Sequence, residues 1–212
     1  MKKIIFLETT EKEKEILQKY PDFLKKVDFS SEKLSFKNAQ KFKDYEVVSI
    51  FIGSQLSKEI LNQLSNLKFI ATRSTGFDHI DLDYCTEHNI KVVNASGYAT
   101  VGVAELAIGL MIDVYRHISL LDQDIRNGKT RNNFLGRQLR GKTVGIIGTG
   151  AIGLETAILL KAMGCNIIAW NRTEREEANK LNIKYVSLQD LMKQSDIISL
   201  HVPLTKETHH LI

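Results

Sequence analysis

The sequence predicts an α/β protein in which parallel β-sheets are covered by helices. Short apolar runs that suit β-strands alternate with amphipathic segments rich in Lys and Glu along the 212 residues. This alternation is expected when helices cover both faces of a parallel sheet. A glycine-rich turn at residues 148–153 joins one such strand to an apolar helix, which points to the same class. A hydrophobic content of 43% with 25% charged residues excludes a disordered chain.

Residues 1–98 are predicted to form a flavodoxin-like layer structure. Their apolar runs are short enough for strands, and the segments between them have the periodicity of amphipathic helices. Strands are expected at residues 3–7, 47–52, 68–72 and 91–93, and helices near residues 11–20, 58–65 and 81–88.

A long apolar helix is predicted at residues 101–117, just after a domain boundary placed between residues 98 and 99. Apolar residues occur at nearly every turn, so the helix is expected to be buried between domains or subunits, and a homodimer through it is predicted. The polar, basic stretch at residues 122–142 is interpreted as a surface connection. The apolar positions are Ala104, Leu106, Ala107, Leu110, Met111 and Val114.

A second series of strands and helices follows this connection. Strands are expected at residues 143–147, 166–170, 184–186 and 197–202, with helices at residues 152–163, 174–181 and 188–194.

The glycine-rich turn of this second series has the spacing of a phosphate-binding loop. Gly148 suits a tight turn, Gly150 lets backbone approach a pyrophosphate, and Gly153 permits close packing of helix on strand. The free amides at the start of the helix would receive the negative charge. The alternative is a glycine-rich turn without a ligand. With the strands around it, the turn predicts an incomplete Rossmann dinucleotide-binding domain at residues 99–212.

The residues that follow the second strand of this unit bear on the choice of coenzyme. NAD-binding proteins place an Asp or Glu about 20 residues after the glycine turn, whereas an Arg nearby accommodates the 2′-phosphate of NADP. The sequence has Asn171 and Arg172 there, with Arg175 close behind. We therefore predict an NAD(P) site that favours NADP over NAD. The alternative is that Arg172 is a solvated residue at the start of a helix.

Charge and cysteine content exclude several other classes. The formal net charge is +4, but the Lys residues are interspersed with Glu, which argues against nucleic-acid binding. Cys85 and Cys165 are far apart and lie in no metal-binding motif, so neither a disulfide nor a metal site is predicted. The apolar run at residues 4–7 is too short for a signal peptide, and no stretch is long enough to span a membrane. A cytoplasmic protein is expected.

Four stretches of the sequence resemble the D-isomer-specific 2-hydroxyacid dehydrogenases, especially the D-lactate dehydrogenase-like and glyoxylate or hydroxypyruvate reductase-like members. They lie in the same order and spacing at residues 72–81, 97–105, 148–153 and 196–208. The resemblance implies an oxidoreductase that transfers hydride between NAD(P)H and a small 2-keto acid or D-2-hydroxy acid. It also implies that residues 1–98 belong to the substrate domain.

The resemblance assigns substrate-binding roles to the Thr75–Gly76 turn and to Tyr98. Backbone amides of the turn would hold the substrate carboxylate, and glycine permits the close approach. Tyr98 matches a tyrosine that faces the active-site cleft. The alternatives are a plain turn at Thr75–Gly76 and a hinge-packing aromatic at Tyr98.

Cofactor roles also follow from the resemblance. The amides of Ala151 and Ile152 would meet the pyrophosphate, Val202 and Pro203 would form the adenine and ribose wall, and Thr208 would make a polar contact.

The catalytic Arg, Glu and His of this family lie beyond the stretch at residues 196–203. We therefore expect them after Ile212, with no catalytic residue in this chain, and interpret the sequence as an N-terminal fragment that is inactive and poorly soluble alone. One alternative is a non-catalytic nicotinamide-binding regulatory module of the same fold. Another is a related enzyme, such as a phosphoglycerate, phosphite or formate dehydrogenase, because the fold does not determine the substrate.

Overall fold

The computed structural model describes residues 3–129 and 135–212. The chain divides into two compact units, Met1–Tyr98 and Ala99–Ile212, which are described separately.

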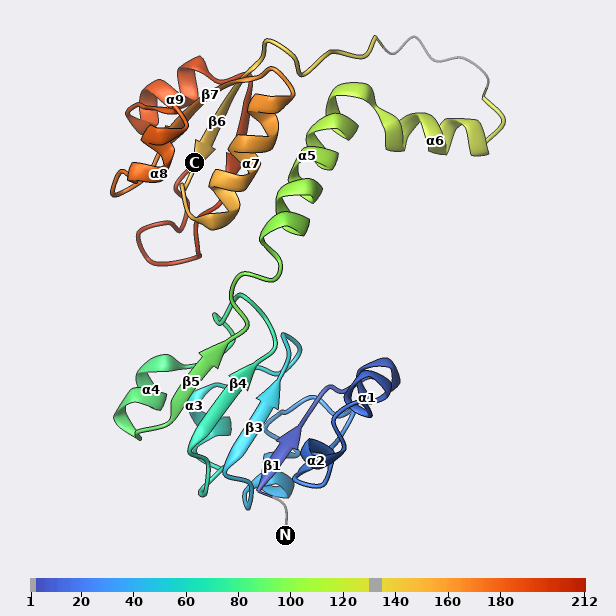
Figure 1. Ribbon diagram of the computed structural model, residues 1–212, viewed down its shortest axis with the longest axis vertical. Helices are drawn as coiled ribbons and strands as arrows, with labels where there is room; N and C mark the ends of the chain where they lie inside the picture. Colours follow the sequence, from blue (N-terminus) through green and yellow to red (C-terminus); the bar gives the residue numbers. More distant parts are fainter. Residues whose placement is uncertain (1–2, 130–134) are drawn as a thin grey trace. The chain divides into compact units, whose positions relative to one another are not determined.

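The first unit contains a parallel sheet with the strand order β2-β1-β3-β4-β5. This is the order of flavodoxin-like folds, as the sequence predicts. Figure 1 labels four of these strands, β1, β3, β4 and β5. The strands are β1 (Ile4–Phe6), β2 (Val27–Phe29), β3 (Val47–Ile50), β4 (Phe69–Thr72) and β5 (Lys91–Asn94).

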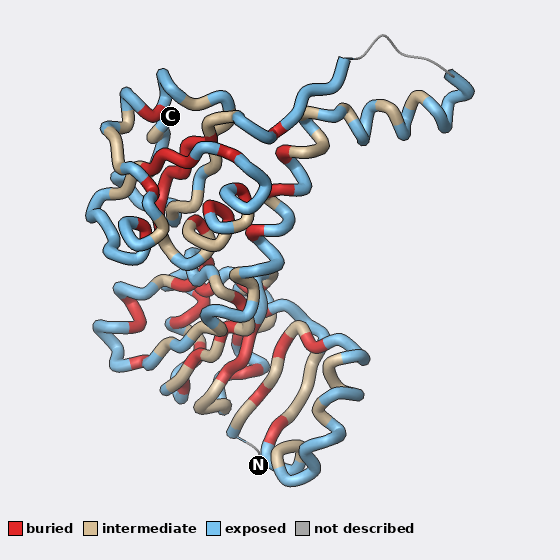
Figure 2. The backbone as a smooth tube through the Cα atoms, turned by 45° about the horizontal axis from the view of Figure 1, so that its top comes forward, coloured by how far each residue is buried: buried red, intermediate tan, exposed pale blue. Residues whose placement is uncertain are grey.

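Short helices connect these strands and cover the sheet. They are α1 (Glu11–Leu17), α2 (Pro21–Leu24), the 3₁₀ helix η1 (Ala39–Phe42), α3 (Lys58–Leu61) and α4 (Leu82–Glu87). A capping box fixes the start of α1, because Thr10 accepts from the amide of Glu13 while the Glu13 carboxylate accepts from the amide of Thr10. The core lies along the central strands, where Val48, Ile50 and Ile70 are fully buried (Figure 2).

The second unit contains a parallel sheet with the strand order β8-β7-β6-β9. This is the order 3-2-1-4 with which a dinucleotide-binding sheet begins. The strands are β6 (Thr143–Ile147), β7 (Asn166–Trp170), β8 (Lys184–Tyr185) and β9 (Ile197–Leu200), and the helices among them are α7 (Ala151–Ala162), α8 (Glu176–Lys180) and α9 (Leu188–Gln194).

The long helix α5 (Thr100–Arg116) opens this unit and packs on α7. Its buried residues are Ala104, Ile108 and Met111. By contrast, Leu106, Leu110 and Val114 are more than half exposed in this chain, so only one face of the helix is buried within it, and burial between subunits stays a prediction.

A second helix, α6 (Ile118–Arg126), follows directly, where the sequence analysis predicts a surface connection from residue 122. The break between the helices lies at His117, whose φ of 54° is left-handed. The carboxylate of Asp113 accepts hydrogen bonds from the amide and hydroxyl of Ser119, in the first turn of α6. Residues 130–134 of the predicted connection lie outside the described residues.

Other differences from the predicted elements concern short helices and short strands. The helices α2 and η1 are not predicted. β2 is not predicted, because Asp28 interrupts its apolar residues and Lys and Ser residues flank them. β8 ends at Tyr185 and β9 at Leu200, each before the predicted end, because pairing with the neighbouring strand stops there. The amide of His201 still donates to the carbonyl oxygen of Ile147 at 2.7 Å, and residues 201–203 then line a cleft.

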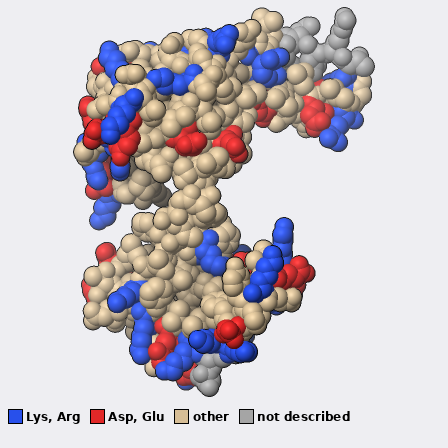
Figure 3. All heavy atoms as spheres, in the orientation of Figure 1, with Lys and Arg blue, Asp and Glu red and all other residues tan. Residues whose placement is uncertain are grey.

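The surface carries interspersed Lys, Arg, Asp and Glu side chains on the face shown in Figure 3. Both cysteines are buried and unpaired. In residues 3–129 and 135–212, no group of three or more His, Cys, Asp or Glu side chains is placed to hold a metal ion. None of the helices that the structure describes is long and apolar enough to cross a membrane.

Candidate functional site

The turn after β6 has the geometry of a phosphate loop. Gly148 has a φ of 96°, which favours glycine, and its amide donates to the carbonyl oxygen of Trp170 at 2.8 Å. A Cβ atom on Gly148 would lie 2.4 Å from the carbonyl oxygen of His201. The turn is therefore held between the ends of β7 and β9.

The next two glycines of the motif differ in what surrounds them. A Cβ atom on Gly153 would lie 2.0 Å from the carbonyl oxygen of Gly148, so this glycine allows the helix to pack on the turn. A Cβ atom on Gly150 would meet no protein atom within 4 Å. The packing of the chain itself therefore does not require glycine at position 150, and the space beside its backbone is open to a ligand.

The start of α7 presents backbone amides to this open space. Gly150 is the N-cap residue and has no side chain to bond them, and Ala151 and Ile152 are the first helical residues. Amides in the first turn of a helix lack partners within the helix and attract anions. The start of α7 can thus accept a phosphate group.

A cleft of about 580 Å³ adjoins this helix start. It is in the size range of small-molecule and cofactor sites. Six of the ten predicted cofactor residues line it, namely Gly148, Gly150, Asn171, Arg172, Val202 and Pro203.

The charged residues of the cleft come from the segment between β7 and α8 and from the first turn of α8. Arg172 and Arg175 line the cleft, together with Glu174, Glu176 and Glu177. The side chain of Asn171 bonds within the same segment, donating to the carbonyl oxygen of Thr173 at 2.7 Å. The two Arg side chains are the cationic groups among the lining residues.

Thr208 is not among the lining residues of the cleft. Its hydroxyl donates to the carbonyl oxygen of Pro203 at 2.5 Å and accepts from the amide of Thr205 at 2.7 Å. In this structure Thr208 therefore closes the turn that follows the cleft wall.

In the first unit, the predicted substrate turn lies at the carboxyl end of β4. The amides of Thr75, Gly76 and Phe77 donate no hydrogen bond within the part of the chain that the structure describes. The Asn94 side chain donates to the carbonyl oxygen of Thr75 at 2.7 Å, which anchors the turn. Successive free amides of this kind form anion-binding concavities.

Buried side chains form a chain of hydrogen bonds that supports the Thr75–Gly76 turn. Ser74 Oγ donates to the carbonyl oxygen of Gly76 at 2.7 Å and so accepts from Thr72 Oγ1, 2.6 Å away. Thr72 Oγ1 in turn accepts from Nε2 of His79 at 3.2 Å, which assigns the proton of the neutral imidazole to Nε2. Burial lowers the pKa of His79, although the negative charges of Asp78 and Glu8 act in the opposite direction and raise it.

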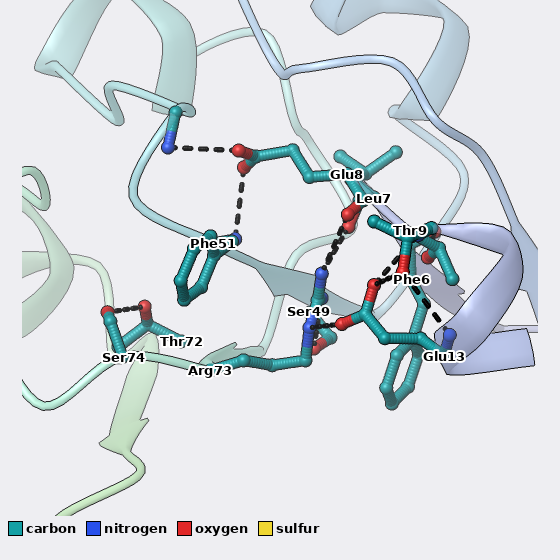
Figure 4. Close-up of polar contacts among 12 residues, drawn as sticks. Phe6, Leu7, Glu8, Thr9, Glu13, Ser49, Phe51, Thr72, Arg73 and Ser74 are labelled. Carbon is teal, nitrogen blue, oxygen red and sulfur yellow. Dashed lines mark hydrogen bonds and ion pairs between the residues drawn. The ribbon is translucent and has the colours of Figure 1, made fainter. Parts of the chain in front are cut away.

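A carboxylate at the end of β1 fixes the neighbouring loop. Glu8, whose φ of 54° is left-handed, accepts hydrogen bonds from the amides of Phe51 and Gly53 at 3.0 and 2.9 Å (Figure 4). It also accepts from the hydroxyl of Ser54. The guanidinium of Arg73 donates to the carbonyl oxygens of Leu7 and Glu8, which joins the ends of β1 and β4.

Tyr98 is the last residue of the first unit and is 67% exposed. Its hydroxyl is accessible in this chain.

Comparison with known proteins identifies the family of the chain. The profile of the D-isomer specific 2-hydroxyacid dehydrogenase NAD binding domain matches residues 108–212. The apo-structure of D-lactate dehydrogenase from Escherichia coli is 35% identical with a TM-score of 0.83, and the match covers 100% of this chain and 68% of that one. The chain belongs to the D-isomer-specific 2-hydroxyacid dehydrogenase family. Residues 108–212, within its second unit, therefore belong to the NAD-binding domain of such a dehydrogenase.

Two further relatives indicate how much of the dehydrogenase the chain represents. D-lactate dehydrogenase from Aquifex aeolicus, solved with NAD and lactic acid, is 32% identical with a TM-score of 0.88, and the match covers 98% of this chain and 63% of that one. Glyoxylate reductase from Thermococcus litoralis is 38% identical over 182 residues, which is 82% of this chain and 55% of the relative. The chain thus spans a little over half the length of this reductase and about two thirds of the two lactate dehydrogenases.

Proposed function

We propose that this chain contributes the coenzyme site and part of the substrate site of an enzyme that transfers hydride between NAD(P)H and a small 2-keto acid or D-2-hydroxy acid. The observation that carries the proposal is the start of α7, where amides without helical partners open beside a cleft of about 580 Å³. The bound nicotinamide supplies the hydride chemistry, and the protein binds and orients the reactants.

The residues of the cleft fit a dinucleotide. Gly150 leaves room for a diphosphate at the amides of Ala151 and Ile152, while Val202 and Pro203 offer an apolar wall. NADP is preferred over NAD in this proposal, because Arg172 and Arg175 can pair with a 2′-phosphate and Asn171 carries no charge to repel it.

The coenzyme preference is tested by titrating the protein with NADPH and NADH while following Trp170 fluorescence. Arg172→Ala should weaken NADPH binding about tenfold and NADH binding less than about twofold, because only NADPH carries the 2′-phosphate. Arg126→Ala, in α6 and outside the cleft lining, is the control. Tighter binding of NADH than NADPH by the unaltered protein would contradict the preference.

For the substrate, the proposal places a carboxylate on the free amides of Thr75 and Gly76, with Tyr98 as a further contact. The hydrogen-bonded chain from His79 to the carbonyl oxygen of Gly76 supports it, because it holds the turn in one conformation. Addition of oxamate, a mimic of a 2-keto acid, should shift the amide NMR signals of Thr75 and Gly76. Shifts elsewhere with none at this turn would contradict the assignment.

None of His79, His88 and His201 is proposed as the proton-transfer group. These three histidines form hydrogen bonds through a ring nitrogen within the chain. His79 bonds to Thr72, His88 to the carbonyl oxygen of Tyr84, and His201 to Ser199. In a catalytically active enzyme that contains this chain, conservative replacement of any of the three should leave kcat within about an order of magnitude, whereas loss of a general acid–base group costs about 10²–10⁴-fold.

A homodimer through the apolar helix at residues 101–117 and a cytoplasmic location complete the proposal. Leu106, Leu110 and Val114 form an exposed apolar stripe on α5 that a second copy would cover. The unpaired cysteines suit a reducing compartment.

A further inference from the structure

The hydroxyl of Tyr185 joins two segments that border the coenzyme cleft. Tyr185 ends β8 and is paired with Ala169 of β7. Its Oη lies 2.7 Å from Oγ1 of Thr149 and accepts a hydrogen bond from the amide of Arg175 at 3.0 Å. Because a phenol can accept and donate at once, both contacts can form together.

Both partners belong to the walls of the cleft. Thr149 lies between Gly148 and Gly150 and is 1% exposed, so its side chain points into the protein while its backbone forms the phosphate loop. Arg175 is the N-cap residue of α8 and lines the cleft. A single hydroxyl therefore sets the separation between the phosphate loop and the segment that carries Arg172.

Tyr185 itself is not among the residues that line the cleft. Any effect of its hydroxyl on coenzyme binding must act through Thr149 and Arg175.

We infer that Tyr185 is a positioning residue for coenzyme selection. The Tyr185 hydroxyl ties the 171–175 segment to the phosphate loop. When the diphosphate of a coenzyme lies at the start of α7, this link holds the side chains of Arg172 and Arg175 next to the 2′-phosphate. The inference rests on the proposed function. It predicts an effect on NADPH that exceeds the effect on NADH, since the diphosphate-binding amides stay in place when the hydroxyl is removed.

The test is fluorescence titration of the protein with NADPH and NADH in a matched set of variants. Tyr185→Phe and Thr149→Val should each weaken NADPH binding about three- to tenfold, the size expected for one lost hydrogen bond, with a smaller change for NADH. Thr149→Ser, which keeps the hydroxyl, should bind NADPH as the unaltered protein does. In the double variant, Tyr185→Phe with Thr149→Val, the fold-loss in NADPH affinity should be smaller than the product of the two single fold-losses, because both substitutions remove the same contact.

Tyr45→Phe controls for loss of a tyrosine hydroxyl elsewhere, because that hydroxyl donates to Asp28 in the first unit. Unchanged NADPH affinity in Tyr185→Phe would overturn the inference, and so would equal losses for NADH and NADPH. If the unaltered protein bound neither coenzyme, the proposed function would fail, and this inference with it.

Discussion

A Cβ atom on Gly153 would lie 2.0 Å from the carbonyl oxygen of Gly148, so the first turn of α7 and the turn after β6 are in direct backbone contact. Real Cβ atoms do not approach other atoms this closely, and the obstacle here is backbone rather than a flexible side chain. The contact positions the start of α7 beside the cleft. A change at Gly153 must therefore move the amides proposed to bind the diphosphate.

Gly153→Ala is expected to destabilise the second unit by about 2 kcal/mol or more, at the upper part of the range for overpacked sites, and to abolish coenzyme binding. Chemical denaturation and fluorescence titration measure the two effects. Gly109→Ala in α5 is the matched control, because a Cβ there meets nothing within 4 Å. It should be neutral or stabilise the helix by up to about 1 kcal/mol. Equal stability and equal coenzyme binding of the two variants would show that the contact between Gly153 and Gly148 is unimportant.

The lowered pKa of His79 predicts a stability that depends on pH. Burial keeps the folded imidazole neutral, whereas the unfolded chain takes up a proton below the usual pKa of 6.5. The stabilisation is thus fully present above pH 6.5 and is lost as pH falls through the folded pKa. Unfolding of the first unit measured from pH 8 to 5 should show this loss, and His79→Asn should reduce it. An NMR titration midpoint of His79 above 6.5 would contradict the prediction.

The two thiols should be unreactive in the folded protein. Burial, with the charge of Asp81, raises the pKa of Cys85 to about 11, and burial raises the pKa of Cys165. Since the thiolate is the nucleophile, alkylation by iodoacetamide at pH 8 should be slow and should become fast in denaturant. Mass spectrometry of the labelled protein measures it. Rapid native labelling at either position would show that the packing described around it is wrong.

Glu8→Ala is expected to destabilise the first unit by about 1–3 kcal/mol, because the amides of Phe51 and Gly53 lose a charged acceptor. Hydrogen exchange at these two amides should accelerate, while exchange in β6 stays unchanged. Glu15→Ala, at an exposed position of α1, is the control and should change stability by less than about 0.5 kcal/mol. Unaltered exchange at Phe51 and Gly53 would rule out the bridging role of Glu8.

The exposed apolar stripe of α5 predicts self-association. Leu110→Lys should shift the protein towards monomer in sedimentation velocity, because a charge would be buried in the interface. Phe36→Lys, at an equally exposed position of the first unit, should leave the association unchanged. A monomer at all concentrations in the unaltered protein would contradict the dimer.

The sequence predicts the features that depend on local pattern. The α/β class and the central strands follow from hydrophobic periodicity, and the phosphate loop follows from the glycine spacing at residues 148–153. The Gly148 turn and the Gly153 contact have the geometry that this spacing requires. β2 is missed because Asp28 interrupts its apolar residues and Lys and Ser residues flank it, whereas β1, of the same length, lies in a continuous apolar run.

The contacts that support the site lie beyond the reach of sequence patterns. Glu8 meets the loop at Phe51 across 43 residues, and Tyr185 meets Thr149 across 36 residues. Neither residue belongs to a recognisable motif. The partners are brought together by the parallel pairing of β1 with β3 in the first unit, and of β6 with β7 and β7 with β8 in the second. His79 lies within a motif, but its role depends on burial that a turn sequence does not reveal.

The central claim is that backbone amides at the start of α7 hold the diphosphate of a nicotinamide dinucleotide. Amide NMR spectra of the protein titrated with NADPH and NADH test it most directly. We expect saturable shifts of the Gly150, Ala151 and Ile152 amides, with the largest changes in the second unit. Saturation of the protein by either coenzyme with these three signals unmoved, or no binding of either, would contradict it.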